Sequence, residues 1–446
     1  MTDENIELFG SERNAKIKVI GVGGCGCNAV KTMQEIGISG VNFVVCNTDL
    51  QVLNDSPIRH RIQLGAKLTK GLGAGNDPEV GRSSALESLD EIRDLLDDGH
   101  TQMVFVTAGM GGGTGTGAAP VIANVAKGMG LLTVAVVTIP EKNEGFPRIR
   151  QATEGVRQMS QCVDSLLIVN NQRLRELYSD LPVSKSFQMC DNVLARAVKG
   201  ISEIISIPGF VNIDFADVKK AMTDSGVSVV GLAEGETQYD AAGKVVLDRG
   251  MDAIKKALDS PLTNNSDIRG AQYVLVNMVS SSEKELTQGE QGAITDYLCS
   301  LSGSSSRNRT LITGYRLDDT LGDKVQVTVV ATGFAVSCFE DNVEQPSDNA
   351  IMIDENGQEI GMANQPDDPD EKPNSIELPV EDEETQRIID RLYRPAPQSK
   401  STVNAEREYQ ISSLMPPQCH RLSDFRNEDF LTRFETEPAC IRRRIK

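Results

Sequence analysis

Three features are missing from the sequence, and each absence excludes a class of protein. No apolar run reaches the roughly 18 residues of a membrane-spanning helix, and the polar, acidic residues 1–13 do not form a signal peptide. The nine cysteines include no CxxC pair, which favours reduced thiols over disulfides or a zinc site. No GxxxxGK(S/T) motif occurs, which argues against a P-loop GTPase or kinase. We therefore expect a soluble, cytoplasmic protein with no direct membrane insertion.

Negative charge is abundant but concentrated in one segment. Of the net charge of −19, residues 340–385 contribute −15, because they hold 16 acidic residues and one basic residue, Lys372. After Cys338 the chain is poor in apolar residues, which predicts a flexible, self-repelling linker. One apolar and basic patch, residues 387–394, interrupts this linker. The acidity therefore belongs to a tail and says little about the surface of the folded part.

Apolar runs alternate with helical stretches in the first part of the chain. Because these runs are mostly apolar rather than strictly alternating, they indicate a parallel sheet covered on both faces. Helices are predicted from the first strand through Met33, near residues 79–96 and from residue 118 onward. The strands are predicted at residues 17–20, 41–46, 103–106, 132–137 and 166–169.

The pattern changes near Ser186. Apolar residues recur every three or four positions from Phe187 to Ile205, which predicts a long amphipathic helix ending at Pro208-Gly209. Beyond it we expect a second, smaller α/β domain that ends near Phe334. Its predicted strands are residues 273–279, 310–313 and 325–332, and its predicted helices lie near residues 217–222 and 252–258.

Residues 109–117, GMGGGTGTG, are the most informative segment. Six glycines permit positive φ angles and a close approach to a ligand, so that a row of N–H groups can point at one anion. The segment stands between a predicted strand and a predicted helix, and a helix N-terminus favours phosphate. We therefore predict a phosphate-binding loop.

A second glycine motif, Gly21-x-Gly23-x-x-Gly26, follows the first strand. With Asp49 about 20 residues further on, it also fits a dinucleotide-binding fingerprint, which leaves an NAD-binding oxidoreductase open as an alternative. A richer glycine loop after a later strand is not needed for NAD, so it favours a different nucleotide.

GGGTGTG is similar to the signature loop of the tubulins, and the chain from about Ile17 to about Phe334 resembles the FtsZ family of bacterial tubulin homologues. The resemblance implies a tubulin-like α/β fold, in which a parallel-sheet nucleotide-binding domain is joined by a long central helix to a smaller α/β domain. The implied segments are a flexible N-terminus (1–14), a GTP-binding domain (15–182), the central helix (183–208), a C-terminal activation domain (209–338), a disordered acidic linker (339–430) and a partner-binding peptide (431–446).

The resemblance also implies GTP or GDP and Mg²⁺ as cofactors, with the metal held mainly by phosphates and water. Phe187 is expected to stack on the base, and the Asp191 carboxylate to accept hydrogen bonds from guanine. The residues that the family uses to hold the nucleotide correspond here to Gly23, Gly24, Cys25, Gly26, Cys27, Asn28, Ala74, Gly75, Gly111, Gly112, Gly113, Thr114, Gly115, Thr116, Glu144, Arg148, Phe187 and Asp191.

This chain departs from the family pattern at three places. Cys25 and Cys27 stand where many relatives have Gly or Asn, and Glu141 replaces an aromatic residue after Pro140. Asn76-Asp77 stands where relatives usually carry Ala-Asn, and Asp77 reads equally well as the cap of a following helix.

Residues 212–217 resemble the family's catalytic loop. Asn212, Asp214 and Asp217 are the implied catalytic residues. In the family, this loop enters the nucleotide pocket of the next subunit, and its acidic pair polarises the attacking water. The resemblance therefore implies a GTPase that is activated by self-assembly into head-to-tail filaments.

The expected partners are other copies of the chain and, through residues 431–446, membrane-anchoring and regulatory division proteins. No nucleic-acid partner is expected. The resemblance places the protein in the cytoplasm at the division site, in a midcell ring. A tubulin-like filament protein for DNA segregation or cell shape stays open as an alternative.

Overall fold

The computed structural model describes residues 15–177, 182–240, 245–259, 268, 270–301, 309–334 and, in the acidic tail, 385, 388–389 and 392–393. The predicted N-terminal segment 1–14, the terminal peptide 431–446 and the rest of the linker lie outside these residues.

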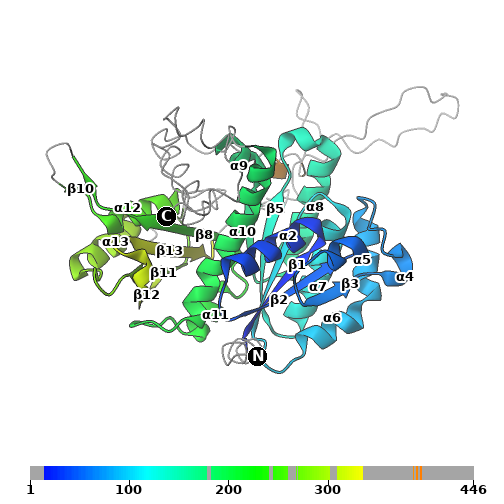
Figure 1. Cartoon of the computed structure of the whole chain (residues 1–446), viewed down its shortest axis with the longest axis horizontal. Helices are drawn as coiled ribbons and strands as arrows, with labels where there is room; N and C mark the ends of the chain where they lie inside the picture. Colours follow the sequence, from blue (N-terminus) through cyan, green and yellow to red (C-terminus); the bar gives the residue numbers. More distant parts are fainter. Residues whose placement is uncertain are drawn as a thin grey trace, which may run out of the picture. The chain divides into compact units, whose positions relative to one another are not determined.

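Seven parallel strands form the larger sheet, in the order β3-β2-β1-β4-β5-β6-β7 (Figure 1). Every residue of β1, β5 and β6 is buried, which is why these strands are mostly apolar rather than alternating. The parallel sheet predicted from the sequence is therefore confirmed. The strands are β1 (Ile17–Val22), β2 (Val41–Asn47), β3 (His60–Gln63), β4 (Met103–Gly109), β5 (Leu132–Ile139), β6 (Ser165–Asn170) and β7 (Gly226–Val227).

Helices pack on both faces of this sheet. Val19 belongs to one buried cluster and Ile20 to the other, because successive residues of a strand point to opposite faces. The first cluster includes α2 (Gly23–Ile36) and α10 (Val183–Ser206), and the second includes α7 (Gly113–Gly128) and α8 (Phe146–Cys162). The other helices on this part of the chain are α3 (Leu50–Asn54), α4 (Ala66–Thr69), α5 (Pro78–Glu87), α6 (Leu89–Leu96), η1 (Lys142–Glu144) and α9 (Asn171–Leu177).

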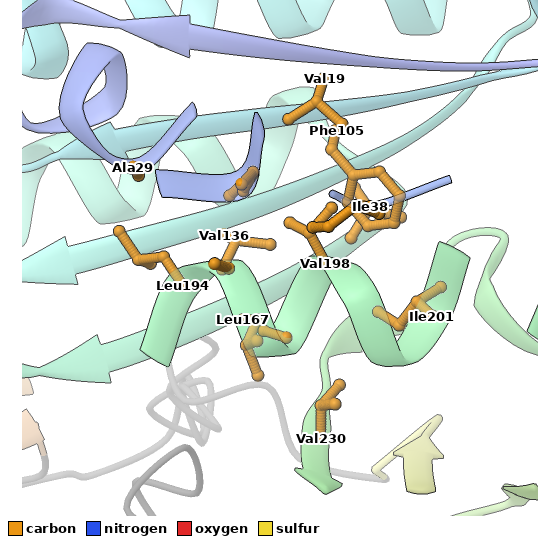
Figure 2. Close-up of a cluster of buried hydrophobic side chains, with 14 of the residues drawn as sticks. Val19, Ala29, Ile38, Phe105, Val136, Leu167, Leu194, Val198, Ile201 and Val230 are labelled. Atoms are coloured by element: carbon orange, nitrogen blue, oxygen red, sulfur yellow. The ribbon is translucent and has the colours of Figure 1, made fainter. Parts of the chain in front are cut away.

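The long helix α10 confirms the predicted amphipathic helix and contacts both sheets. Figure 2 shows Leu194 and Val198 of α10 beside Val136 of β5, while Val230 lies on the other side of the helix. The helix ends at Ser206, two residues before Pro208, because proline has no N–H to continue the hydrogen-bond ladder.

The second sheet has four strands in the order β12-β11-β13-β8. β11 pairs with β12 in parallel and with β13 antiparallel, and α12 and α13 supply buried residues to its own hydrophobic cluster. The elements of this part are α11 (Phe215–Met222), β8 (Val229–Gly235), the small β9–β10 pair (Gln238–Tyr239 and Val245–Leu247), α12 (Arg249–Leu258), β11 (Tyr273–Ser280), α13 (Gln288–Ser300), β12 (Thr310–Leu317), η3 (Asp319–Leu321) and β13 (Val325–Thr332).

Several elements differ from the sequence-based expectation. The helix predicted near residues 79–96 is divided at Ser88, whose hydroxyl accepts a hydrogen bond from the N–H of Gly65. The helices α2 and α7 begin inside their glycine motifs, at Gly23 and Gly113, rather than after them. Strand β8 and helix α13 were not predicted at all. The glycine motifs are therefore helix N-termini as much as loops.

Candidate functional site

The two glycine motifs meet at the carboxyl ends of β1 and β4, which are neighbouring parallel strands. A Cβ atom added to Gly23, whose φ is +72°, would lie 3.0 Å from the backbone nitrogen of Gly115. A Cβ atom on Gly109 would lie 2.8 Å from the Cβ atom of Cys25. Contacts this short leave no room for side chains, so the glycines are what allow the two motifs to approach each other.

The third glycine loop, residues 71–77, packs against the same place. A Cβ atom on Gly113 would lie 2.9 Å from the Cβ atom of Ala74. Gly75 and Asn76 both have positive φ, at +59° and +63°. The Asp77 carboxylate accepts a hydrogen bond of 2.9 Å from the N–H of Glu79, so Asp77 caps α5 and its interpretation as a helix cap is confirmed.

Two helix N-termini converge at this place, because α2 begins at Gly23 and α7 begins at Gly113. Among the described residues, neither Val22 nor Gly112 makes a side-chain capping hydrogen bond at these helix starts. The first-turn N–H groups of both helices are thus available to one anion, which the two helix dipoles also favour. No described atom lies within 4 Å of a Cβ atom placed on Gly24 or Gly112, so open space lies in front of both residues.

The residues of the first glycine motif divide between two faces of α2. Gly24 and Asn28 are exposed and Cys25 is half-buried, whereas Gly26 and Cys27 are buried against the core. The Cys27 Sγ atom lies 3.9 Å from both the Asn47 Nδ2 atom and the Cys46 carbonyl oxygen. Any contact of Cys27 with a ligand therefore has to come from its backbone.

Glu144 and Arg148 form an ion pair of 3.0 Å beside the glycine loop of β4. A Cβ atom on Gly111 would lie 3.0 Å from the Cγ atom of Arg148 and 3.4 Å from the Cγ atom of Pro140. This i,i+4 pair is therefore not an isolated surface pair, because the stem of Arg148 packs on Gly111.

The start of α10 brings Asp191 to the same region. Its carboxylate is close enough to Cys25 that its charge helps to raise the pKa of that thiol, although burial is the larger cause. Burial also raises the pKa of Asp191 to about 7. Phe187, four residues earlier, is 66% exposed, so its ring is not part of the hydrophobic core.

Two threonines at this edge of the sheet, Thr48 and Thr138, were not predicted from the sequence. The Thr48 Oγ1 atom lies 2.7 Å from the Oγ1 atom of Thr114, which joins the end of β2 to the first turn of α7. Thr138, near the end of β5, places its Oγ1 atom 3.6 Å from the Cys25 Sγ atom. Neither threonine belongs to a glycine motif, and only the pairing of the strands shows that they lie here.

The predicted catalytic residues lie at the other end of α10. Asp214 precedes α11 as its N-cap residue, and both Asn212 and Asp214 are exposed. The Asn212 Oδ1 atom accepts a hydrogen bond from the N–H of Gly209, and Val211 forms a β-bridge with Tyr315. Asp217 lies half-buried in the first turn of α11.

The distance between these acids and the glycine loops follows from helix geometry. On α10 (Val183–Ser206), Asp191, which lies near Cys25, and Ser206 are 15 residues apart, which at 1.5 Å per residue is about 22 Å. Ser206 at its C-terminal end contacts Gly40, directly before β2, so this end lies at the amino edge of the parallel sheet. In Figure 1, α9 and α11 accordingly mark opposite ends of α10. The structure thus brings the predicted nucleotide residues together and holds the predicted catalytic residues apart from them.

The described part of the chain contains neither a side-chain metal cluster nor a membrane-spanning helix. No three His, Cys, Asp or Glu side chains are grouped there so as to hold a metal ion, and the position of Mg²⁺ stays a prediction. No helix in the described part is long and apolar enough to span a bilayer.

Comparison with known protein families assigns both sheets to related families. The GTPase-domain model of the Tubulin/FtsZ family matches residues 16–179, and the C-terminal-domain model of the FtsZ family matches residues 227–335. The first of these families is defined by a GTPase domain, so the oxidoreductase alternative is no longer needed to explain the first glycine motif.

Curated relatives and solved structures agree with these matches. The cell division protein FtsZ of Porphyromonas gingivalis is 41% identical over 96% of this chain and 85% of its own length. The cell division protein FtsZ 1 of Thermococcus kodakarensis is 40% identical over 74% of this chain and 84% of its own length. The structure of an FtsZ dimer from M. jannaschii is 38% identical, with a TM-score of 0.63 over 75% of this chain and 93% of that chain. The chain therefore belongs to the Tubulin/FtsZ family and carries its GTPase domain.

Proposed function

We propose that the protein is a cell-division GTPase that polymerises head to tail into protofilaments and a division ring, and that each active site is shared by two adjacent subunits. The observation that carries this proposal is the separation of Asp214 from the glycine loops by much of the length of α10. An active site that needs both groups is incomplete in one chain and complete where the α11 end of one subunit meets the glycine loops of the next. Such an arrangement makes hydrolysis depend on assembly.

The nucleotide is proposed to bind with its phosphates at the N-termini of α2 and α7. The N–H groups of Gly113, Thr114 and Gly115 face this position, and Ala74 and Gly75 close it on one side. Glu144 and Arg148 are proposed to contact the ribose and phosphates. Mg²⁺, when bound, supplies positive charge at the phosphates, and phosphate oxygens and water would be its main ligands.

The base is proposed to lie against the start of α10. The exposed ring of Phe187 is available for stacking on a purine. The Asp191 carboxylate, on the same helix face, accepts from the N1–H and 2-amino groups of guanine, which adenine lacks. This pair is proposed to make the site selective for GTP over ATP.

Exposed apolar side chains at both ends support a head-to-tail contact. Leu68, which is 51% exposed, lies just before the third glycine loop, and Leu72, which is 86% exposed, lies within it. Phe210 and Val211, which are 86% and 49% exposed, lie beside Asp214. Burial of these two sets against each other would stabilise the filament contact and would exclude water from the phosphates. A contact between two different surfaces gives an open filament rather than a closed ring when it relates neighbouring subunits by nearly a translation.

Hydrolysis within such a contact needs the incoming carboxylates to act on water. Asp214 and Asp217 are proposed to orient and polarise the attacking water, and Asn212 to position the loop through its hydrogen bond to Gly209. Phosphoryl transfer depends mainly on positioning and electrostatics, so a loop that arrives only on assembly can switch it on.

The experiment that tests the proposal is GTP turnover per subunit as a function of protein concentration, with light scattering recorded in parallel. Turnover and scattering that appear together above one threshold concentration are expected. Turnover that is independent of concentration would contradict the shared site. Localisation of the labelled protein to a midcell ring, rather than to DNA or the cell periphery, separates division from the alternative filament functions.

A further inference from the structure

Five described residues of the acidic tail pack onto the GTPase domain. They are Thr385, Ile388, Ile389, Leu392 and Tyr393, which we call the tail anchor. Ile388, Ile389, Leu392 and Tyr393 are only 6%, 9%, 3% and 7% exposed. All four belong to the buried cluster that α7 and α8 form on the sheet. These four residues, which belong to the apolar and basic patch of the tail, therefore form a docking segment.

Hydrogen bonds fix this segment to the ends of two strands. The Tyr393 hydroxyl donates a hydrogen bond of 2.6 Å to the carbonyl oxygen of Pro140, directly after β5. The Asn170 Nδ2 atom, at the end of β6, donates a hydrogen bond of 2.7 Å to the carbonyl oxygen of Leu392. Within the anchor, the Tyr393 N–H donates to the Ile389 carbonyl oxygen at 3.0 Å, as in a helical turn. Such contacts define one orientation of the segment rather than a loose apolar collapse.

The contact with Pro140 connects the anchor to the glycine site. Pro140 packs beside Gly111 and begins the short segment that leads to Glu144. The Lys142 Nζ atom lies 5.9 Å from the centre of the Tyr393 ring, within the range of a cation–π contact. Burial raises the pKa of the Tyr393 hydroxyl, and the charge of Glu144 raises it further, which places Glu144 near the ring.

The other end of the anchor lies along α8. Thr385 and Ile388 line a cavity of about 510 Å³ together with residues of α5, α7 and α8. This cavity includes Thr116 of α7 and Pro78 of α5, which lie in the first turns of their helices. The anchor thus lines a cavity with the first turn of α7, whose N-terminus forms part of the phosphate end of the candidate site.

We propose that the tail anchor acts as a clasp on the nucleotide site. Its docking holds the Pro140–Glu144 segment in place and thereby slows the release of bound nucleotide. The inference rests on the proposed function, because it takes Glu144, Arg148 and the glycine loops as the nucleotide site. Tyr393 is then a positioning residue that acts through the Pro140 carbonyl group. The surface that the tail anchor covers on the GTPase domain is occupied by this chain's own tail. A soluble copy of the segment should bind the same surface.

The test uses the full chain loaded with the fluorescent nucleotide mant-GDP and measures nucleotide release. Ile388→Ser with Ile389→Ser removes the packing, and Tyr393→Phe removes only the hydroxyl that reaches Pro140. Ile351→Ser with Ile353→Ser is the matched control, with the same chemical change elsewhere in the tail. A coupling of ordinary size predicts release about three- to thirtyfold faster for the double variant, a smaller increase for Tyr393→Phe, and no change for the control.

Two further measurements separate a clasp from a general loss of structure. A synthetic peptide of residues 383–396, added to the Ile388→Ser/Ile389→Ser protein, should slow release back toward the wild-type rate. If the double variant unfolds, as judged by circular dichroism, Tyr393→Phe decides the question. Release from Tyr393→Phe at the wild-type rate would then overturn the clasp. A wild-type protein that does not retain mant-GDP would instead overturn the proposed nucleotide site, so the two failures are distinguishable.

Discussion

Ser206 and Gly40 are in direct contact: a Cβ atom on Gly40 would lie 2.6 Å from the Cβ atom of Ser206. This contact seats the C-terminal end of α10 at the amino edge of the parallel sheet, while the glycine loops lie at the carboxyl edge. Asp214 follows that end of the helix and Asp191 lies near its beginning. One chain therefore presents the proposed nucleotide-binding residues and the proposed catalytic residues on opposite edges of the sheet, which is the basis for the predictions below.

Asp214→Asn should abolish GTP turnover while leaving GTP binding unchanged, because Asp214 does not reach the glycine loops of its own chain. Turnover and equilibrium binding of GTP, measured on the same preparation, check this. Asp94→Asn, which neutralises an exposed carboxylate on α6, is the control and should keep full turnover. Loss of GTP binding in Asp214→Asn would contradict the shared site.

Two inactive variants should restore activity when mixed. Gly112→Asp places a carboxylate at the phosphate end of the site, where no described atom lies within 4 Å of the new Cβ atom, so it should block nucleotide binding and keep the fold. Mixed with Asp214→Asn, it forms contacts in which an intact pocket meets an intact Asp214. Turnover of the mixture should exceed that of either variant alone. The control Gly112→Ala adds a side chain without a charge and should bind GTP. A mixture of the two inactive variants that stays inactive would argue against a site shared by two subunits.

Phe210→Ser should weaken assembly without weakening GTP binding. Removal of a large apolar side chain from a buried contact costs about 1.5–3 kcal/mol, which corresponds to a threshold concentration roughly ten- to a hundredfold higher. Light scattering across a concentration series measures this threshold. Tyr239→Ser, at an aromatic residue that is 63% exposed on β9, is the control. An unchanged threshold for Phe210→Ser would remove this residue from the filament contact.

Guanine-nucleotide affinity should fall as the pH falls through about 7. Burial raises the pKa of Asp191 to about 7, and only its carboxylate form accepts hydrogen bonds from guanine. Below that pH the affinity should decrease by up to about tenfold per pH unit, and binding near neutral pH should release protons. Calorimetry in buffers of different ionisation enthalpy measures both effects. Asp191→Asn should bind weakly without this dependence, and a flat wild-type profile from pH 6 to 8 would contradict the assignment.

The same group should affect the stability of the nucleotide-free protein. An unfolded Asp has a pKa of about 3.9, so between roughly pH 4 and 7 the folded protein binds more protons at Asp191 than the unfolded chain does. The free energy of unfolding should therefore decrease as the pH rises through this range. Urea unfolding at pH 5 and pH 8 should show a smaller decrease for Asp191→Asn than for the wild-type protein, and equal decreases would exclude Asp191 as the cause.

The cysteines of the first glycine motif should be poor nucleophiles. Burial raises the pKa of Cys25 to about 11 and that of Cys27 to about 12. At pH 8 only about one Cys25 in a thousand is then a thiolate, which is the reactive form. Iodoacetamide labelling followed by mass spectrometry should therefore modify the exposed Cys299 at least about tenfold faster than Cys25. Equal labelling rates would show that the site opens to solvent more than its buried geometry indicates.

Local sequence patterns predicted those strands and helices whose apolar spacing is visible along the chain. The apolar runs at β1, β4, β5 and β6 and the three- to four-residue repeat of α10 were predicted from the sequence and are confirmed. Strand β8 was missed because it contains glycines, and its geometry explains them. A Cβ atom on Gly231 would lie 2.0 Å from the Ala257 carbonyl oxygen, so glycine is there for the close packing of α12, which no local pattern reveals.

The candidate site divides in the same way. The glycine motifs predict phosphate binding from the sequence alone, because the positive φ angles that glycine permits and its accessible N–H groups are properties of the local chain. Other features depend on which strands and helices pack together. They are the closeness of these motifs to Thr48 and Thr138, the burial that raises the pKa of Asp191, and the placing of Cys25 at the site but Cys27 in the core. The separation of Asp214 from its own glycine loops depends on this packing as well. Sequence alone therefore determined the family, the parallel sheet and the phosphate-binding chemistry. Only the tertiary structure decided that Asp214 lies apart from the glycine loops of its own chain. It also decided that Tyr393, far along an acidic tail, contacts Pro140, because that contact joins residues separated by hundreds of positions.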